Sequence, residues 1–140
     1  MNSNGHKRIL IVDDEESIRT LLKHTFEERN DYHAVTVPDG IIAIDLLSRQ
    51  GFDLVLTDWL MGDMDGLELA RIIRDMRPDT RILLMTGNAA PELDDAVKCS
   101  RLDGWIKKPF SLPHILHTVE QVIGDRVQSG SGTNPLIQSG

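Results

Sequence analysis

The sequence has little cysteine, no long apolar run and fewer basic than acidic residues. Its single cysteine, Cys99, cannot form an internal disulfide, so we expect a reducing, cytoplasmic environment. The helical pattern around Cys99 predicts a buried or half-buried thiol. No apolar run approaches the length of a membrane span, and no apolar signal region follows the polar N-terminus, so a soluble protein without membrane contact is expected.

The charge balance is acidic, with 22 acidic and 15 basic residues and a net charge of −7. An overall negative field argues against direct nucleic-acid binding by this domain. Apolar residues make up 40% of the 140 residues, which predicts one globular domain with a real core. We expect a flexible N-terminus over 1–7, a domain over 8–124 and a Ser/Gly-rich linker or artificial tail over 125–140.

Five short apolar runs alternate with helical patterns along the chain. The predicted strands are 9–12, 33–37, 52–57, 81–85 and 104–107, with 33–37 near the sheet edge. The predicted helices are 17–28, 41–48, one from Gly66 to just before Pro78, one from Pro91, and 111–123. In the first helix, the apolar face is Ile18, Leu21, Leu22 and Phe26. This order predicts an α/β fold with a doubly wound, five-stranded parallel sheet and helices on both faces.

Polar side chains follow four of the predicted strands. They are Asp13 and Asp14, then Asp58, Thr86 and Lys108. A lone aspartate at a strand end is usually a turn former or a helix cap. Because the carboxyl ends of parallel strands meet at one edge, where such folds bind ligands, the recurrence favours a site.

Three carboxylates in a small space repel one another and require a proton or a cation. Mg²⁺ suits oxygen ligands at about 2.0–2.1 Å and keeps several waters. A hydroxyl and an ammonium beside such an ion form a cradle for a phosphoryl group.

Five motifs in this order resemble the receiver domain of two-component response regulators. They are residues 9–15, 56–58, 64–66, 84–87 and 107–110, and the resemblance spans about residues 7–123. It implies a flavodoxin-like (βα)5 fold with strand order 2-1-3-4-5. It also implies that the protein is a signalling switch and not an enzyme. Such a switch catalyses only its own phosphoryl transfer and slow autodephosphorylation.

The resemblance assigns roles to individual residues. Asp58 matches the phosphoacceptor, which takes a phosphoryl group from a phosphohistidine. Asp14, Asp58 and the backbone carbonyl of Leu60 match direct Mg²⁺ ligands, and Asp13 matches a ligand acting through water. Mn²⁺ is an alternative ion.

Other matches concern the response to phosphorylation. Thr86, Gly87 and Lys108 match phosphoryl-binding residues, and Thr86 with Trp105 match the residues that switch. The Lys108–Pro109 peptide bond matches one that is cis in the family.

The segment after Asp58 departs from the family in one respect, because Gly62 stands where proline is frequent. Leu60 and Asn88 match the two positions that tune dephosphorylation. We expect the apolar Leu60 to hinder water and to lengthen the phosphorylated lifetime.

The expected partners are a sensor histidine kinase or a phosphotransfer protein. The output domain or downstream protein is not identified by the sequence. Phosphorylation is expected to remodel the face made by the fourth helix, fifth strand and fifth helix, which could also support a homodimer.

Three other functions compete with this interpretation. A Mg²⁺-dependent phosphohydrolase of the haloacid-dehalogenase type needs a second aspartate where Leu60 stands. A dinucleotide- or flavin-binding domain needs a Gly-rich loop after the first strand, which is absent here. A receiver-like scaffold that is never phosphorylated is disfavoured by the complete acidic set.

Overall fold

A computed structural model of the protein describes residues 6–29, 31–62, 64–88, 90–99 and 101–124. The strands are β1 (Lys7–Val12), β2 (Tyr32–Val37), β3 (Leu54–Asp58), β4 (Arg81–Thr86) and β5 (Gly104–Lys107). The helices are α1 (Glu16–Glu27), α2 (Gly40–Arg49), α3 (Gly66–Met76), α4 (Pro91–Lys98) and α5 (Leu112–Gly124). The expected tail at 125–140 and most of the expected N-terminal segment lie outside the described residues.

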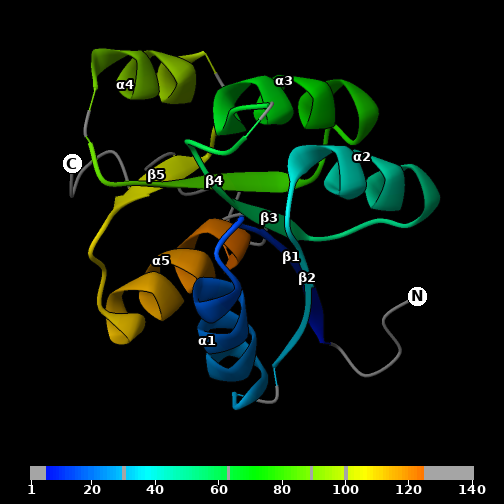
Figure 1. Ribbon diagram of the computed structural model, residues 1–140, viewed down its shortest axis with the longest axis vertical. Coiled ribbons are helices and arrows are strands. Elements are labelled where there is room, and N and C mark those ends of the chain that lie inside the picture. The colour runs from blue at the N-terminus through cyan, green and yellow to red at the C-terminus, as the bar shows by residue number, and fades with distance from the viewer. Residues whose placement is uncertain (1–5, 30, 63, 89, 100, 125–140) are drawn as a thin grey trace.

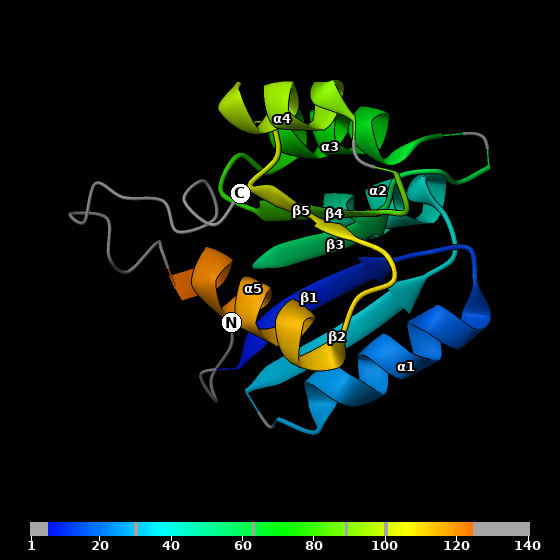
Figure 2. The same cartoon turned by 90° about the vertical axis from the view of Figure 1, so that its left-hand side faces the viewer.

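The five strands form one parallel sheet in the order β2-β1-β3-β4-β5. Helices α1 and α5 cover one face, and α2, α3 and α4 cover the other (Figure 1, Figure 2). The predicted doubly wound fold, its strand order and the edge position of β2 are confirmed. Among the described helices, none is both long enough and apolar enough to cross a membrane.

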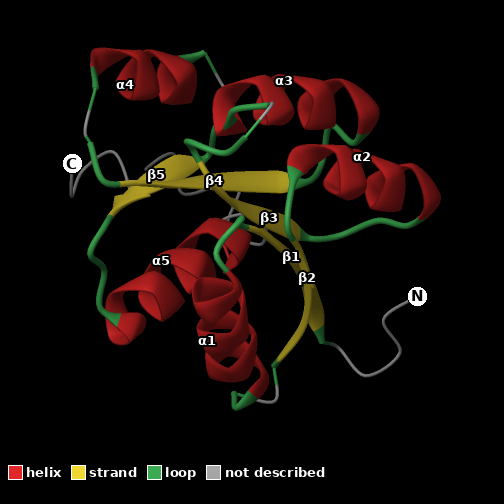
Figure 3. Cartoon of the chain, viewed as in Figure 1, coloured by secondary structure: helices red, strands yellow, loops and turns green. Residues whose placement is uncertain are grey.

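The sheet is buried on both faces, and β1 shows why its sequence is continuously apolar. Successive strand side chains point to opposite faces. Ile9 and Ile11 therefore join the core under α1 and α5, whereas Leu10 and Val12 join the core under α2, α3 and α4. All four side chains are fully buried (Figure 3 shows the two helical layers around the sheet).

Strand boundaries differ from the prediction by one or two residues. Strand β1 begins at Lys7, which pairs with Tyr32. Strand β3 begins at Leu54 rather than at Phe52, and it includes Asp58 as its last residue. Such shifts are the usual error of patterns based on hydrophobicity alone.

Two side chains are exposed against expectation. Leu21 is 42% exposed, because α1 packs through Leu22 and Phe26, and the adjacent position on a helix is turned about 100° away. Cys99 is exposed at the C-cap of α4, a short helix that buries only one side. The predicted burial of Leu21 and Cys99 is therefore wrong.

Register and capping fix the carboxyl edge of the sheet. Val12 pairs with Thr57, and Asp58 pairs with Met85, so the residues after β1 lie beside the end of β3. The helix that follows β3 begins at a cap, because the Asp65 carboxylate accepts a hydrogen bond from the backbone N–H of Glu68 at 2.8 Å.

Candidate functional site

Three aspartates meet at the carboxyl edge of the sheet. Asp13 and Asp14 follow β1, and Asp58 ends β3. One carboxylate oxygen from each lies within 4.8 Å of the others. Asp13 is fully buried, Asp58 is half-buried and Asp14 is exposed, so the cluster runs from the core to solvent. The structure thus brings together the predicted acidic residues from separate parts of the chain.

Lys108, just after β5, supplies the cation of this cluster. Its Nζ donates to Asp58 Oδ1 at 3.1 Å and lies 3.6 Å from Asp13 Oδ2. Its backbone N–H donates to the Thr86 carbonyl at 2.7 Å, which ties the ends of β4 and β5 together. The Lys108–Pro109 peptide bond is cis. One positive charge therefore faces several carboxylates.

The carboxylate of Asp58 is held from one side. The backbone N–H of Trp59 and the Lys108 ammonium both donate to Oδ1, at 3.0 and 3.1 Å. Within the described part of the chain, no hydrogen bond to Oδ2 is present. One oxygen of Asp58 is therefore anchored, and the second is left for another partner.

The pKa values of this pair follow from burial and charge. Burial raises the pKa of the Asp58 carboxyl and the negative charge of Asp13 adds to the rise, while Lys108 and the Trp59 N–H oppose it without cancelling it. Burial alone would lower the pKa of the Lys108 ammonium, but Asp58, Asp13 and Glu15 together raise it. Lys108 therefore stays protonated at neutral pH.

The donor set fits a hard divalent cation. Asp13 Oδ1 accepts from the backbone N–H of Glu15 at 2.8 Å, but its buried Oδ2 accepts no hydrogen bond from any described residue. The Lys108 ammonium lies 3.6 Å from this oxygen, but it also pairs with Asp58, so one positive charge does not balance three carboxylates. Together with Asp14 and Asp58, Asp13 offers the oxygen ligands that Mg²⁺ prefers.

The predicted phosphoryl-binding residue Thr86 ends β4 beside this cluster. Its buried hydroxyl donates to the Asn88 carbonyl and accepts from the Asn88 N–H, both at 3.0 Å. The hydroxyl is therefore turned toward its own loop and not toward Asp58. Gly87 and Asn88 are exposed on this loop.

Trp105 and Leu60 lie at the margin of the site. Trp105 is half-buried in β5, packs against the core under α4, and donates its Nε1–H to Asp94 Oδ1 at 3.3 Å. The Leu60 side chain is 65% exposed, two residues beyond Asp58. Within the described part of the chain, the hydrogen bonds of the Asp58 carboxylate come from Trp59 and Lys108, and none comes from Trp105 or Leu60.

Gly66 packs directly against the end of β3, a contact that the sequence did not predict, although 64–66 is one of the motifs that resemble the family. A Cβ at this position would lie 2.5 Å from the Asp58 carbonyl oxygen and 2.6 Å from a methyl carbon of Leu84. Its N–H donates to the Trp59 carbonyl at 2.7 Å and closes the loop after β3. The sequence offered one signal for this contact. Gly66 is the first residue of a helix, directly after the capping Asp65, and most residue types are tolerated there.

Comparisons with known proteins match this chain and its fold. The family model for the response regulator receiver domain matches residues 9–120. The response regulator receiver protein CpdR of Brucella abortus is 34% identical over 117 residues, covering 84% of this chain and 97% of its own. The chemotaxis protein CheY4 of Vibrio cholerae superposes with a TM-score of 0.77 at 31% identity, covering 84% of this chain and 98% of that one.

A further solved structure, response regulator TrrA from Thermotoga maritima in complex with Mg²⁺ and BeF, has a TM-score of 0.72 at 33% identity, covering 83% of this chain and 98% of that one. The chain belongs to the response regulator receiver domain family. Other relatives are longer, and the chain spans about half the length of response regulator MprA of Mycobacterium, covering 47% of it. Receiver domains bind Mg²⁺ and interact with a histidine kinase or phosphotransfer partner and with downstream targets.

Proposed function

We propose that this domain accepts a phosphoryl group on Asp58 from the phosphohistidine of a sensor histidine kinase or phosphotransfer protein. The observation that carries the proposal is the Asp58 carboxylate, with Oδ1 anchored by Lys108 and Trp59 and Oδ2 without a described donor. A carboxylate oxygen attacks phosphorus, and the P–N bond to the histidine breaks. The electron pair stays on the imidazole, and an acyl phosphate forms on Asp58.

Asp14, Asp58 and the backbone carbonyl of Leu60 would hold Mg²⁺ directly, and Asp13 would hold it through water, with Mn²⁺ as an alternative. When bound there, the ion would supply positive charge that offsets the charge of the phosphoryl oxygens. Lys108 already faces Asp58 and is placed to bind a phosphoryl oxygen once the acyl phosphate has formed.

Phosphorylation then acts as a switch. The new group adds about −1.5 to −2 charge and three acceptor oxygens. The Thr86 hydroxyl leaves its bonds to Asn88 and donates to the phosphoryl group, which the Gly87 backbone also contacts. Trp105 leaves Asp94 and turns inward.

The movement of Trp105 changes the surface formed by α4, β5 and α5. This surface controls an output domain or a downstream partner, and it is also the site of a phosphorylation-dependent homodimer. The domain is a switch whose only catalysis is its own phosphorylation and slow dephosphorylation.

Leu60 and Asn88 tune the lifetime of the acyl phosphate. The exposed Leu60 side chain is apolar and hinders the approach of water to Asp58. The variant Leu60→Asn places an amide there that can orient water, so we expect its acyl phosphate to be lost faster. Timing the loss of acyl phosphate tests this role, and an unchanged rate would rule it out.

The central experiment titrates Mg²⁺ and then beryllofluoride, a phosphoryl mimic, while tryptophan fluorescence is followed. The backbone N–H of Trp59 donates to Asp58, so Trp59 lies next to the proposed site. We therefore expect the fluorescence of the parent protein to change when Mg²⁺ binds. Asp58→Asn should not respond to beryllofluoride. Asp75→Asn makes the same charge change on an exposed position of α3 and should respond like the parent.

Intact mass after treatment with acetyl phosphate gives an independent outcome. One added phosphoryl group in the parent and in Asp75→Asn, but not in Asp58→Asn, supports the proposal. An unmodified parent would instead favour a scaffold that is never phosphorylated. Turnover of a general phosphoester with release of phosphate would favour a phosphohydrolase.

A further inference from the structure

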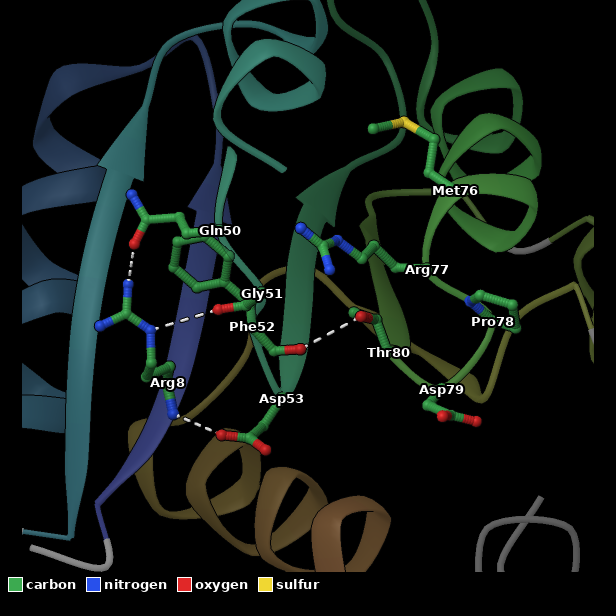
Figure 4. A pocket seen from close by; sticks show the side chains of 10 residues that line it. All are labelled: Arg8, Gln50, Gly51, Phe52, Asp53, Met76, Arg77, Pro78, Asp79 and Thr80. Carbon is green, nitrogen blue, oxygen red and sulfur yellow. Dashed lines mark hydrogen bonds between the residues drawn. The ribbon is translucent and has the colours of Figure 1, made fainter. Parts of the chain in front are cut away.

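A groove of about 670 Å³ lies at the amino edge of the sheet, at the other end of the strands from Asp58 (Figure 4). Its walls are the start of β1, the connection 50–53 between α2 and β3, and the residues 76–80 that end α3 and lead to β4. This volume lies in the range of about 300–1,000 Å³ that small-molecule sites occupy. The function proposed above makes no use of this groove.

Arg8 is fixed in one wall of the groove. Its Nε–H donates to the Gly51 carbonyl at 3.2 Å, one Nη donates to the Gln50 side chain, and its guanidinium lies 4.8 Å from the centre of the Phe52 ring. Among the described residues, its other Nη has no hydrogen-bond acceptor. The guanidinium is thus held in place with donors left over.

Arg77 approaches the same point from the other wall. Its Nε–H donates to the Leu47 carbonyl at 2.9 Å, and within the described part of the chain neither Nη has an acceptor. A Cβ built on Gly51 would lie 3.8 Å from Arg77 Nη1. Arg8 and Arg77 therefore both reach Gly51, and Figure 4 shows them on opposite sides of the Gln50–Phe52 segment.

The described arginines of this chain, whose net charge is −7, differ in whether they form ion pairs. Ion pairs with carboxylates are formed by other arginines, namely Arg29, Arg49, Arg74 and Arg81. The guanidinium groups of Arg8 and Arg77 form no ion pair with any described carboxylate. Asp53 accepts from the Arg8 backbone N–H at 2.8 Å, and Figure 4 shows the Asp79 carboxylate pointing away from both guanidinium groups.

Helix capping explains only part of this arrangement. The Nε bonds neutralise carbonyls at and just after the C-terminal turn of α2, which carries a partial negative charge. The terminal nitrogens remain, and guanidinium forks match phosphate and carboxylate oxygens in a bidentate way. We propose that this groove binds a small oxyanion, a phosphate or a carboxylate, through the guanidinium nitrogens of Arg8 and Arg77 that line it.

The experiment titrates the whole chain, free of Mg²⁺, with inorganic phosphate, pyrophosphate and citrate, and follows backbone amide signals by NMR. Mg²⁺ is left out so that the Asp13, Asp14 and Asp58 carboxylates repel the anions and keep them from binding at the carboxyl edge. Saturable shifts are expected within 50–53 and 77–80. The most responsive of the three probes separates a phosphoryl ligand from a carboxylate ligand.

Matched variants assign the binding to the two guanidinium groups. Arg8→Gln and Arg77→Gln should each weaken binding about tenfold, because each removes a charged hydrogen-bonding partner. Arg71→Gln removes the same charge from an exposed position on α3 and should bind like the parent. Arg77→Lys keeps the charge but loses the fork, so intermediate binding is expected.

Two results would overturn the proposal. In one, shifts rise linearly with anion concentration and are equal in the parent and in all variants, which is general ionic screening. In the other, the parent shows no saturable shift in 50–53 or 77–80 with any of the three anions. The second result stands on the parent protein alone, so it does not depend on the folding of a variant.

Discussion

The two edges of the sheet differ in the charged side chains that gather there, with aspartates at the carboxyl edge and two arginines at the amino edge. At the carboxyl edge, Asp13, Asp14 and Asp58 share the single ammonium of Lys108. At the amino edge, Arg8 and Arg77 are held by backbone carbonyls and form no ion pair with a described carboxylate. At one edge three carboxylates surround the Lys108 ammonium, and at the other two arginines line a groove that the Asp53 and Asp79 carboxylates also line.

The difference shows how the two edges of a parallel α/β fold hold charges of opposite sign. Helix N-termini and strand carboxyl ends share one edge, whereas helix C-terminal carbonyls face the other. The amino edge therefore fixes Arg77 through the Leu47 carbonyl of α2 and Arg8 through the Gly51 carbonyl just after α2. At the carboxyl edge, by contrast, the buried Asp13 and the half-buried Asp58 need a cation beside them.

Removing the shared cation should give the largest effect. Lys108→Met leaves the Asp58 and Asp13 carboxylates without a positive partner, and we expect the Mg²⁺-free domain to lose about 1–3 kcal/mol of stability. Because the site becomes more negative, Mg²⁺ affinity should rise about tenfold. Urea unfolding with and without Mg²⁺ measures both quantities.

Lys107→Met is the matched control, because it removes the same charge from the exposed neighbouring position in β5. It should change stability by less than about 0.5 kcal/mol. Equal effects of the two variants would contradict a special role for Lys108. At the amino edge, Arg77→Gln should leave Mg²⁺ affinity unchanged.

The second-largest expected effect is a difference between the two edges in how well each tolerates a glycine-to-alanine substitution. Gly66→Ala forces a Cβ against the Asp58 carbonyl, and we expect a loss of about 1–3 kcal/mol together with weaker Mg²⁺ binding. Gly51→Ala makes only an ordinary contact at the amino edge and should be neutral or stabilising by about 0.4–1 kcal/mol. Thermal melting and Mg²⁺ titration of both variants test the contrast.

Gly62→Ala provides a control within the same loop as Gly66, since nothing described lies within 4 Å of a Cβ there. A Gly66→Ala protein that binds Mg²⁺ like the parent would show that Gly66 matters for stability alone. Weaker Mg²⁺ binding in Gly66→Ala but not in Gly62→Ala would show that Gly66 positions Asp58.

The smallest expected effect is a pH dependence at the carboxyl edge. Folding raises the pKa of Asp58, so the folded state holds this proton more tightly, and stability falls as pH rises from the ordinary carboxyl range through the folded pKa. Asp58→Asn should therefore be more stable than the parent at neutral pH by about 1 kcal/mol, or roughly 3–6 °C. The difference should vanish in acid.

Asp75→Asn, on an exposed position, should show no such pH-dependent gain over the parent. Urea unfolding of the three proteins from acid to neutral pH, without Mg²⁺, gives the comparison. A gain for Asp58→Asn that persists unchanged in acid would contradict the raised pKa as its cause.

The sequence predicted most of the fold and the acidic members of the site. Apolar runs such as Ile9 to Val12 signal strands buried on both faces, and Asp58 at the end of such a run marks the edge. Periodicity could not decide between Leu21 and Leu22, because both fit a broad apolar stripe and only the packing of α1 separates them.

Contacts between residues distant in the chain were beyond sequence reasoning. Arg8 and Arg77 are unremarkable in the sequence, and only the fold brings both to Gly51. The Thr86 hydroxyl was placed at the correct edge, yet its turn toward Asn88 depends on local loop geometry. Hydrophobic pattern specifies layers, whereas hydrogen-bond direction depends on side-chain rotamers.

The hydrogen bond from the Gly66 N–H to the Trp59 carbonyl closes the base of the loop that carries Leu60. Both ends of that loop are fixed, one at β3 and the other at α3. For synthetic signalling circuits, we predict that the residues between them can be exchanged between receiver domains as one cassette. Signal duration could then be set in the cassette while Asp58 and its lysine keep their positions.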